Sequence, residues 1–198
     1  LEETGAFGVF AAAGQKFDVS PILKVEDNRG KVLEENKNKK GQQVLDPQIA
    51  YEISSILSDN QARSAIFGSR SALYFPDRTV AVKTGTSDDF RDAWTVGYTP
   101  SLAAGVWVGN NNNSAMAGHA AAAMAAAPLW HSFVEKALAG TPNEEFAQPA
   151  GIQKLTVDAL RGSSVKKSCH AAKNRFMTFG SSNLMKSTSK FPKPSIGI

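Results

Sequence analysis

The sequence has 198 residues, of which 42% are hydrophobic and 20% are charged, and this make-up is typical of a folded globular chain with one core. It contains no apolar run of the ~20 residues that a membrane-spanning helix needs, and its single cysteine, Cys169, excludes an internal disulfide. The three histidines are scattered and form no pattern with that cysteine, so neither a metal nor another cofactor is predicted.

The net charge of +4 comes from the C-terminal part of the chain. Residues 161–198 hold eight of the 22 Lys and Arg and none of the 18 Asp and Glu, so residues 1–160 have a net charge of −4. Serines and lysines dominate residues 163–198, which contain few large apolar side chains, and we therefore predict a disordered basic tail there. A tether to an anionic polymer is the alternative interpretation of this tail.

The first forty residues predict a helix followed by a hairpin. Apolar side chains recur at helical spacing over residues 1–13, and Gly14 can end that helix. Residues 21–35 alternate in polarity around the turn 27–30, which is typical of a β-hairpin. The lysines of the polar stretch 36–43 indicate a solvated loop, and no nucleic-acid contact is assigned to them.

A second helix is predicted from Asp46, a good N-cap, and Pro47, a good first helical residue. It should end near residues 59–60, and its predicted apolar stripe is Ile49, Ile53, Ile56 and Leu57. Residues 61–78 are interpreted as a polar connection. Arg63 within this connection is interpreted as a structural partner and not as a ligand-binding residue.

The stretch 79–86 predicts the strand on which the candidate site depends. Thr79 to Val82 favour β-structure, and the two-residue period then places Lys83 on one side and Thr84 with Thr86 on the other. Gly85 has no Cβ and allows close approach to the backbone. An exposed strand edge that carries N–H groups, two hydroxyls and an ammonium could hold a carboxylate or an extended peptide.

Two further strands, 93–98 and 102–109, should follow as an antiparallel meander, because the connections are too short for crossover helices. Trp94 and Tyr98 are predicted to be core residues, and Asp92 is predicted to pair with Arg91 or another cation. A helix is predicted over 120–138, interrupted or kinked at Pro128, with His131 exposed. Its predicted apolar stripe is Trp130, Phe133, Val134, Ala137 and Leu138.

Residues 80–113, VAVKTGTSDDFRDAWTVGYTPSLAAGVWVGNNNN, resemble the C-terminal part of the transpeptidase domain of penicillin-binding proteins, particularly of the bifunctional class that also polymerises glycan. ILSDNQAR before this segment and APLW after it extend the likeness to about residues 1–160. The resemblance implies an α+β fold of the β-lactamase and transpeptidase type, with an antiparallel sheet packed with helices. This partial domain would occupy residues 1–140, followed by an extension over 141–162 and the tail over 163–198.

The resemblance also implies a chemistry, because K-T-G, S-x-x-K and S-x-N together make a serine acyl-transfer site in that family. Lys83 and Thr86 would be catalytic, with the Thr86 N–H as one oxyanion donor, and Thr84, Gly85 and Thr86 would bind substrate. The implied ligands are peptidoglycan stem peptides and the β-lactams that imitate them. The implied location is the outer face of the bacterial cell membrane, with an anchor upstream of these residues.

Literal matches to the other two motifs are interpreted as fortuitous. Ser58 to Asn60 lies too close to Lys83 for the family's S-x-N, and the remaining matches follow K-T-G, which reverses the family order. These later matches are Ser163–Lys166, Ser164–Lys167 and Ser187–Lys190 for S-x-x-K, and Ser181–Asn183 for S-x-N.

The nucleophile is therefore expected in an upstream half of the same domain, and this chain alone is expected to be inactive. Two alternatives remain open: a serine β-lactamase or D,D-carboxypeptidase of the same fold, and a noncatalytic peptide-binding remnant.

Overall fold

Three antiparallel strands form the central sheet, in the order β5 (Ala81–Thr86), β6 (Asp92–Tyr98) and β7 (Ala103–Gly109). The computed structural model describes residues 1–36, 40–119, 121–157 and 175–180. The chain divides into two units, Leu1–Ala150 and Gly151–Ile198, and the sheet belongs to the first. The predicted meander is confirmed. A short 3-10 turn, Asp88–Phe90, joins β5 to β6, and another, Ala117–His119, follows β7.

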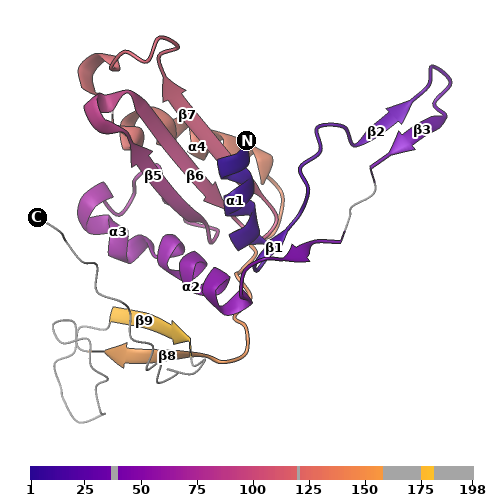
Figure 1. Cartoon of the computed structure of the whole chain (residues 1–198). Coiled ribbons are helices and arrows are strands. Elements are labelled where there is room, and N and C mark those ends of the chain that lie inside the picture. Colours follow the sequence, from indigo (N-terminus) through magenta and orange to yellow (C-terminus); the bar gives the residue numbers. More distant parts are fainter. Residues whose placement is uncertain (37–39, 120, 158–174, 181–198) are drawn as a thin grey trace, which may run out of the picture. The chain divides into compact units, whose positions relative to one another are not determined.

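Helices cover both faces of this sheet, α1 (Glu2–Ala11) on one and α4 (Ala122–Ala137) on the other (Figure 1). On the α1 face, Phe7 and Phe10 pack against Tyr98 with ring centroids 6.2 and 6.3 Å away. Gly105 leaves room for Thr4 of α1, since a Cβ at that position would collide with the Thr4 hydroxyl. The fold is thus the predicted α+β arrangement.

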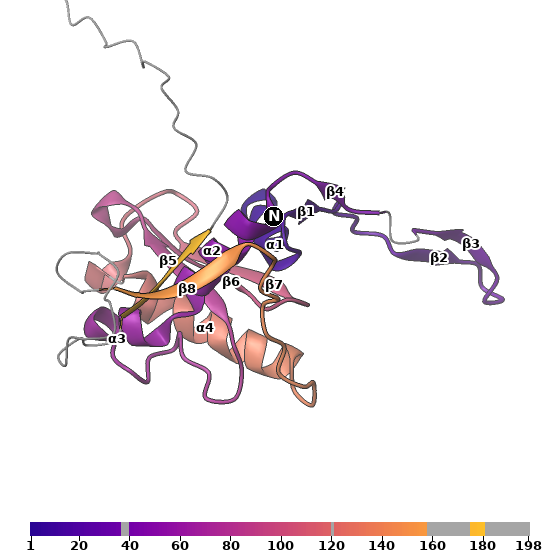
Figure 2. The same cartoon turned by 90° about the horizontal axis from the view of Figure 1, so that it is seen from below.

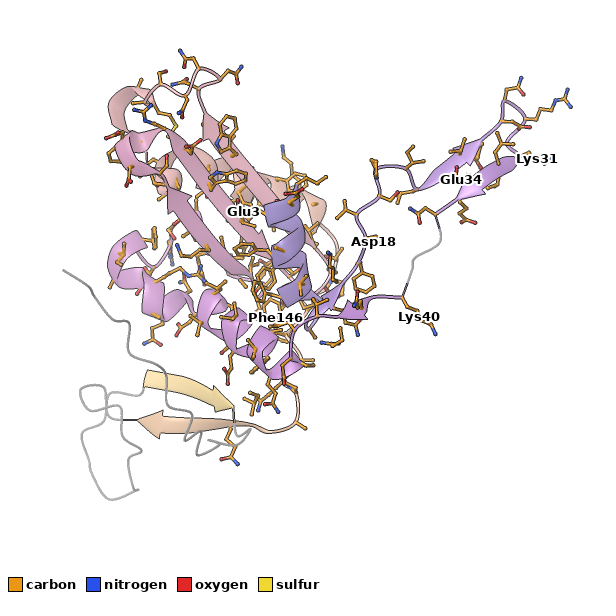
Figure 3. All side chains as sticks on the ribbon, in the orientation of Figure 1. Glu3, Asp18, Lys31, Glu34, Lys40 and Phe146 are labelled. Carbon is orange, nitrogen blue, oxygen red and sulfur yellow. The ribbon has the colours of Figure 1, made fainter. Side chains whose placement is uncertain are left out.

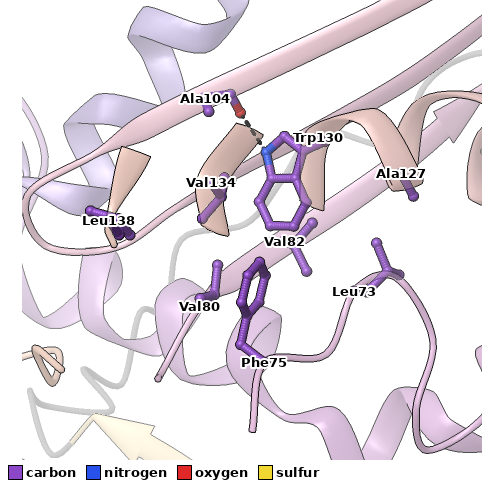
Figure 4. Close-up of a cluster of buried hydrophobic side chains, with 9 residues drawn as sticks. All are labelled: Leu73, Phe75, Val80, Val82, Ala104, Ala127, Trp130, Val134 and Leu138. Atoms are coloured by element: carbon purple, nitrogen blue, oxygen red, sulfur yellow. Dashed lines mark hydrogen bonds between the residues drawn. The ribbon is translucent and has the colours of Figure 1, made fainter. Parts of the chain in front are cut away.

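The core lies between α4 and the sheet, around the fully buried Trp130 (Figure 4). The Trp130 indole N–H donates to the Ala104 carbonyl at 3.0 Å, so its one polar atom is satisfied inside the apolar cluster. Phe133, predicted to belong to the buried stripe, is instead 53% exposed, because the face of α4 toward the sheet is set by other residues. These are Ala122, Ala126, Ala127, Trp130 and Val134.

The helix α2 (Pro47–Ser58) begins as predicted, with the Asp46 carboxylate accepting from the Gln48 N–H at 2.8 Å. Its predicted apolar stripe is wrong at Ile49 and Ile56, which are 48% and 67% exposed, whereas Ile53 and Leu57 are half-buried. The buried residues of α2 are the small Ala50 and Ser54. Small side chains let a helix lie close to its neighbour, and the Ser54 hydroxyl reaches Tyr98 OH at 3.0 Å.

A third helix, α3 (Asn60–Phe67), replaces part of the predicted polar connection. Asp59 follows the last residue of α2 and also caps α3, since its carboxylate accepts from the Ala62 N–H at 2.9 Å. The sequence pattern predicts Asp59 only as the end of a helix. The same residue type that ends one helix can begin the next, so the pattern does not reveal α3.

Residues 15–36 and 40–43 belong to an arm on the first unit (Figure 1). β1 (Gln15–Lys16) pairs with β4 (Gln42–Gln43) at its base, and the predicted hairpin consists of β2 (Lys24–Glu26) and β3 (Val32–Glu35). Figure 2 shows the hairpin reaching away from the sheet and helices of its unit. Lys31 and Glu34 stand on it without neighbours from that body (Figure 3). The short β4 lies inside the stretch predicted as loop.

Residues 141–150 return along the first unit after α4. The Asn143 side chain accepts from the Thr79 N–H at 2.9 Å, and Phe146 packs edge-on against Tyr98 with ring centroids 5.5 Å apart (Figure 3). Gln48 then donates to the Ala150 carbonyl at 2.8 Å. The first unit therefore continues to Ala150, beyond the limit at residue 140 inferred from the sequence.

The second unit contains an antiparallel hairpin of β8 (Ile152–Val157) and β9 (Arg175–Gly180). The tail from residue 163 is predicted to be disordered, whereas β9 is a paired strand within it. Phe176, Thr178 and Phe179 favour β-structure, which composition averaged over the whole tail conceals. Residues 163–174 and 181–198 lie outside the described residues. Among the described helices, none combines the length and apolarity needed to cross a membrane.

Candidate functional site

The candidate site is the outer edge of β5, the strand at one side of the three-stranded sheet. Immediately after β5, the Ser87 N–H donates to the Asp92 carbonyl of β6 at 3.0 Å, so the backbone of Ser87 faces the sheet. The two-residue period then turns the backbone groups of Thr86, Thr84 and Val82 away from β6. Among the described residues no other strand pairs with these groups, so they form a free edge that an extended ligand could pair with.

Lys83 and Gly85 lie on the face of the sheet that α1 covers further along. In the register, Lys83 stands opposite Val96 and Gly85 opposite Trp94, on the same side as Tyr98. The Lys83 side chain is exposed, and its Nζ donates to the Thr84 carbonyl at 2.6 Å. A Cβ built at Gly85 would meet only Trp94 at 3.7 Å, so a ligand can approach the backbone there.

Thr84 and Thr86 point to the opposite face, as the two-residue period predicts. The Thr86 hydroxyl oxygen accepts from the Ala122 N–H at 3.0 Å and thus caps α4, whose own N-cap residue, Ala121, has no side-chain acceptor. The hydroxyl keeps its proton for donation. Thr86 therefore ties the end of β5 to the start of α4 while its backbone N–H stays on the free edge.

Asp92 lies beside this edge, but its predicted pairing with Arg91 is wrong. One carboxylate oxygen accepts from the Ser87 hydroxyl and the other from the Trp107 indole N–H, each at 2.9 Å. Arg91 instead contacts Asp89 at 3.6 Å and donates to the Asn113 carbonyl. Neutral donors from β7 and the β5–β6 connection hold Asp92, because antiparallel pairing brings them nearer than its sequence neighbour.

A cavity of about 160 Å³ lies between α2, α3 and the same edge. Its polar members include Lys83, Thr84, Arg63 and Asp59. Its apolar lining is Ile56, Leu57, Ala62, Phe67, Leu73 and Val82. The cavity therefore adjoins the predicted anion-binding residues and places a second cation, Arg63, beside Lys83.

The segment Ser58 to Asn60 has structural hydrogen bonds of its own. The Ser58 hydroxyl donates to the Ser55 carbonyl at 3.3 Å, Asp59 caps α3, and the Asn60 amide donates to the Ser69 carbonyl at 3.1 Å. The matches to S-x-x-K and S-x-N after residue 160 lie outside the described residues. Over the described part of the chain, no group of three or more His, Cys, Asp and Glu side chains could hold a metal ion.

His131, predicted to be exposed, is half-buried. Its ring stacks on Phe75 with centroids 4.2 Å apart, and Nδ1 lies 3.0 Å from the Ala72 carbonyl. The segment before β5 folds over α4 and covers the ring, which a helical period alone could not predict. His131 is therefore a packing residue between α4 and the segment before β5.

Comparison with curated proteins finds relatives of one kind, although no protein-family model matches the chain. Penicillin-binding protein 1A of Aquifex aeolicus is 35% identical over 152 residues, which cover 75% of this chain and 20% of the relative. Penicillin-binding protein 2D of Bacillus subtilis is 33% identical over 176 residues, which cover 86% of this chain and 25% of the relative. The chain thus spans a quarter or less of the length of these relatives.

Solved structures of penicillin-binding proteins also resemble this chain. Penicillin-binding protein 1A from Haemophilus influenzae superposes with a TM-score of 0.75 at 22% identity, covering 91% of this chain and 32% of the other. PonA1 from Mycobacterium tuberculosis, solved in complex with penicillin V, gives a TM-score of 0.62 at 29% identity, covering 74% of this chain and 40% of the other. The first match shows a shared fold, and the second adds a related sequence.

Proposed function

This chain belongs to the penicillin-binding protein family, and from that premise we propose that β5 forms one wall of the serine acyl-transfer site of a peptidoglycan D,D-transpeptidase. The observation that carries the proposal is the free edge of β5. There the outward backbone groups of Thr84 and Thr86 lie beside the exposed ammonium of Lys83 and the side-chain-free Gly85. An extended peptide with a terminal carboxylate matches such an edge in both hydrogen bonding and charge.

In the proposed reaction, a serine hydroxyl attacks the carbonyl carbon of the penultimate D-Ala of a stem peptide. The serine proton passes to the departing terminal D-Ala, and an ester between enzyme and peptide remains. The amine of a second stem peptide then attacks this ester, which forms the new peptide bond and returns the proton to the serine. β-Lactams form the same kind of ester by ring opening, and PonA1, solved with penicillin V, is a relative of this chain.

Each residue of the edge has a distinct proposed role. Lys83 supplies positive charge toward the substrate carboxylate and toward the serine of S-x-N. The Thr86 N–H donates to the oxyanion that forms when the carbonyl is attacked, and losing such a donor typically costs ~2.7–4 kcal/mol of barrier. Thr84 and Gly85 bind the substrate backbone along the edge.

The nucleophile is proposed to lie outside these 198 residues, because no S-x-x-K precedes K-T-G in the sequence. An upstream half of the same domain would complete the site, and this chain alone would be inactive. The protein is proposed to act outside the cytoplasm, where peptidoglycan is cross-linked, with its membrane anchor also elsewhere in the protein.

Intact-mass measurement after incubation with benzylpenicillin tests the proposal. The 198-residue chain should gain no adduct, whereas a protein extended upstream through its S-x-x-K should gain one per molecule. In the extended protein, Lys83→Ala should slow acylation by about 10²–10³-fold, the scale of one lost oxyanion donor. The matched control is Lys136→Ala, since Lys136 is also an exposed lysine but lies in the last turn of α4, and it should acylate at the wild-type rate.

The fate of the adduct, together with a second assay on stem peptides, separates the alternatives. An adduct that hydrolyses rapidly, so that each enzyme molecule turns over many β-lactam molecules, would indicate a β-lactamase. Release of D-Ala from stem peptides without cross-linking would indicate a D,D-carboxypeptidase. Absence of any adduct on the extended protein would leave the peptide-binding remnant, and an adduct on Ser58 of the short chain would overturn the assignment of the nucleophile.

A further inference from the structure

Arg63 links α3 to the free edge of β5 and to the end of α2. Its Nη2 donates to the Leu57 carbonyl at 2.7 Å, and its Nη1 lies 3.5 Å from the Val82 carbonyl. Leu57 is close to the C-terminus of α2, where carbonyls lack intrahelical partners. Val82 directly precedes Lys83. One planar guanidinium therefore joins three elements immediately behind the proposed catalytic lysine.

Holding a cation at this place is costly. Burial lowers the pKa of Arg63, while the charge of Asp59 acts in the opposite direction. Among the described residues, the side-chain hydrogen bonds of Arg63 go to backbone carbonyls, so the guanidinium is held mainly by dipoles. An apolar side chain would fill the same space without the cost of desolvating a guanidinium. What Arg63 adds is therefore its two hydrogen bonds to the Leu57 and Val82 carbonyls.

The Val82 carbonyl matters because it belongs to the same peptide plane as the Lys83 nitrogen. A trans peptide is rigid, so a donor that fixes the Val82 oxygen also fixes the direction in which the chain enters Lys83. The outward carbonyl of Val82 is also the first acceptor of the free edge. With Arg63 on this carbonyl, the first edge group open to a ligand is the Thr84 N–H, since the Thr84 carbonyl accepts from Lys83.

We propose that Arg63 is a positioning residue that acts through Lys83: by holding the Val82 carbonyl, it sets the orientation of Lys83 and the point at which an acyl donor can start to pair with β5. This inference rests on the proposed acyl-transfer function. The cavity supports it, since Arg63, Lys83 and Thr84 all line it. Arg63 itself does not touch the reacting atoms.

A double-mutant cycle in the upstream-extended protein tests this role, with the rate constant of acylation by benzylpenicillin as the readout. Arg63→Met keeps the aliphatic stem but removes both hydrogen bonds, and it should slow acylation by about tenfold or more, the scale of a hydrogen bond to a charged group. In a Lys83→Ala background, Arg63→Met should slow acylation little further, because the lysine that Arg63 orients is no longer present. Arg70→Met, at an exposed arginine after α3, is the control and should leave the rate unchanged.

A purely structural role makes a different prediction: Arg63→Met would lower the melting temperature and slow acylation equally in both backgrounds. That result would overturn the inference. Should Arg63→Met fail to fold, Arg63→Lys serves as the second variant, because its shorter side chain lacks the two separate nitrogens that contact the Leu57 and Val82 carbonyls. It should also slow acylation only when Lys83 is present, and a wild-type rate in Arg63→Lys would exclude the bridge.

Failure of the inference can be distinguished from failure of the proposed function. If the extended protein is not acylated, or if Lys83→Ala acylates at the wild-type rate, the proposed function itself fails. If the protein is acylated, Lys83→Ala is slow and Arg63→Met is as fast as wild type, only the role of Arg63 is refuted.

Discussion

The central sheet and the β2–β3 hairpin arise from the same kind of sequence but have opposite surroundings. Both are antiparallel, and both follow from alternating apolar and polar residues joined by short turns. In the sheet, Val96 and Tyr98 are 2% and 1% exposed between strands and helices. On the hairpin all four residues of β3 are exposed, including Leu33 at 62%. Local sequence thus determines pairing, whereas burial depends on what packs above the strands.

This difference predicts where substitutions are costly. Trp130→Ala removes the largest side chain of the core between α4 and the sheet, and it should lower the free energy of unfolding by about 3–5 kcal/mol. Phe133→Ala, on the same helix but 53% exposed, is the matched control and should cost far less. Urea unfolding measures both. Equal losses would show that the two faces of α4 are buried to the same extent.

Phe146→Ala tests whether residues 141–150, which follow α4, contribute to the stability of the first unit. Its ring is half-buried against Tyr98, so we expect a loss of about 2 kcal/mol, roughly half that of a fully buried Phe. Phe17→Ala, on the arm and 48% exposed, should cost less than Phe146→Ala. If Phe146→Ala were neutral in urea unfolding, the domain would end near residue 140, as inferred from the sequence.

Ser54→Ala tests the buried polar link between α2 and β6. It leaves the Tyr98 hydroxyl without its partner and should cost about 1–3 kcal/mol. The double variant Ser54→Ala with Tyr98→Phe should be more stable than Ser54→Ala alone, because no polar group is then left unpaired. Additive losses would mean that the Ser54–Tyr98 contact contributes nothing specific.

The same tyrosine predicts a pH dependence. Burial raises the pKa of Tyr98 above its ordinary value of 10.0, although its hydrogen bond with Ser54 partly opposes the shift. The folded state therefore retains a proton that the unfolded state has released, so this stabilising contribution is complete below pH 10.0 and is lost as the pH rises above it. Unfolding measured from about pH 9 to 11 should show a steeper loss for wild type than for Tyr98→Phe.

The smallest effect is expected on the hairpin. Leu33→Ala removes a side chain that is already 62% exposed, so the free energy of unfolding should change by no more than about 0.5 kcal/mol. A loss comparable to that of Phe146→Ala would show that Leu33 is covered in solution.

Much of the candidate site could be predicted from the sequence. The strand predicted at 79–86 and observed at Ala81–Thr86, its two following partners and the opposite directions of Lys83 and Thr84 all follow from short-range pattern. The partners of Asp92, the burial of His131 and the second helix after Asp59 could not be predicted. Each of these depends on a choice between competing hydrogen-bond donors, neighbours or helix caps, and sequence spacing does not rank them.

The sequence by itself determined the antiparallel meander, the Asp46 cap and the candidate edge at 83–86, because strand alternation, capping and turn formation act between residues a few positions apart. Only the tertiary structure decided that Ala50 and Ser54, and not Ile49 or Ile56, are the buried residues of α2. It also brought Thr86 to the start of α4 and Arg63 to the Val82 carbonyl. Those contacts join segments distant in sequence, so they exist only once the helices have packed on the sheet.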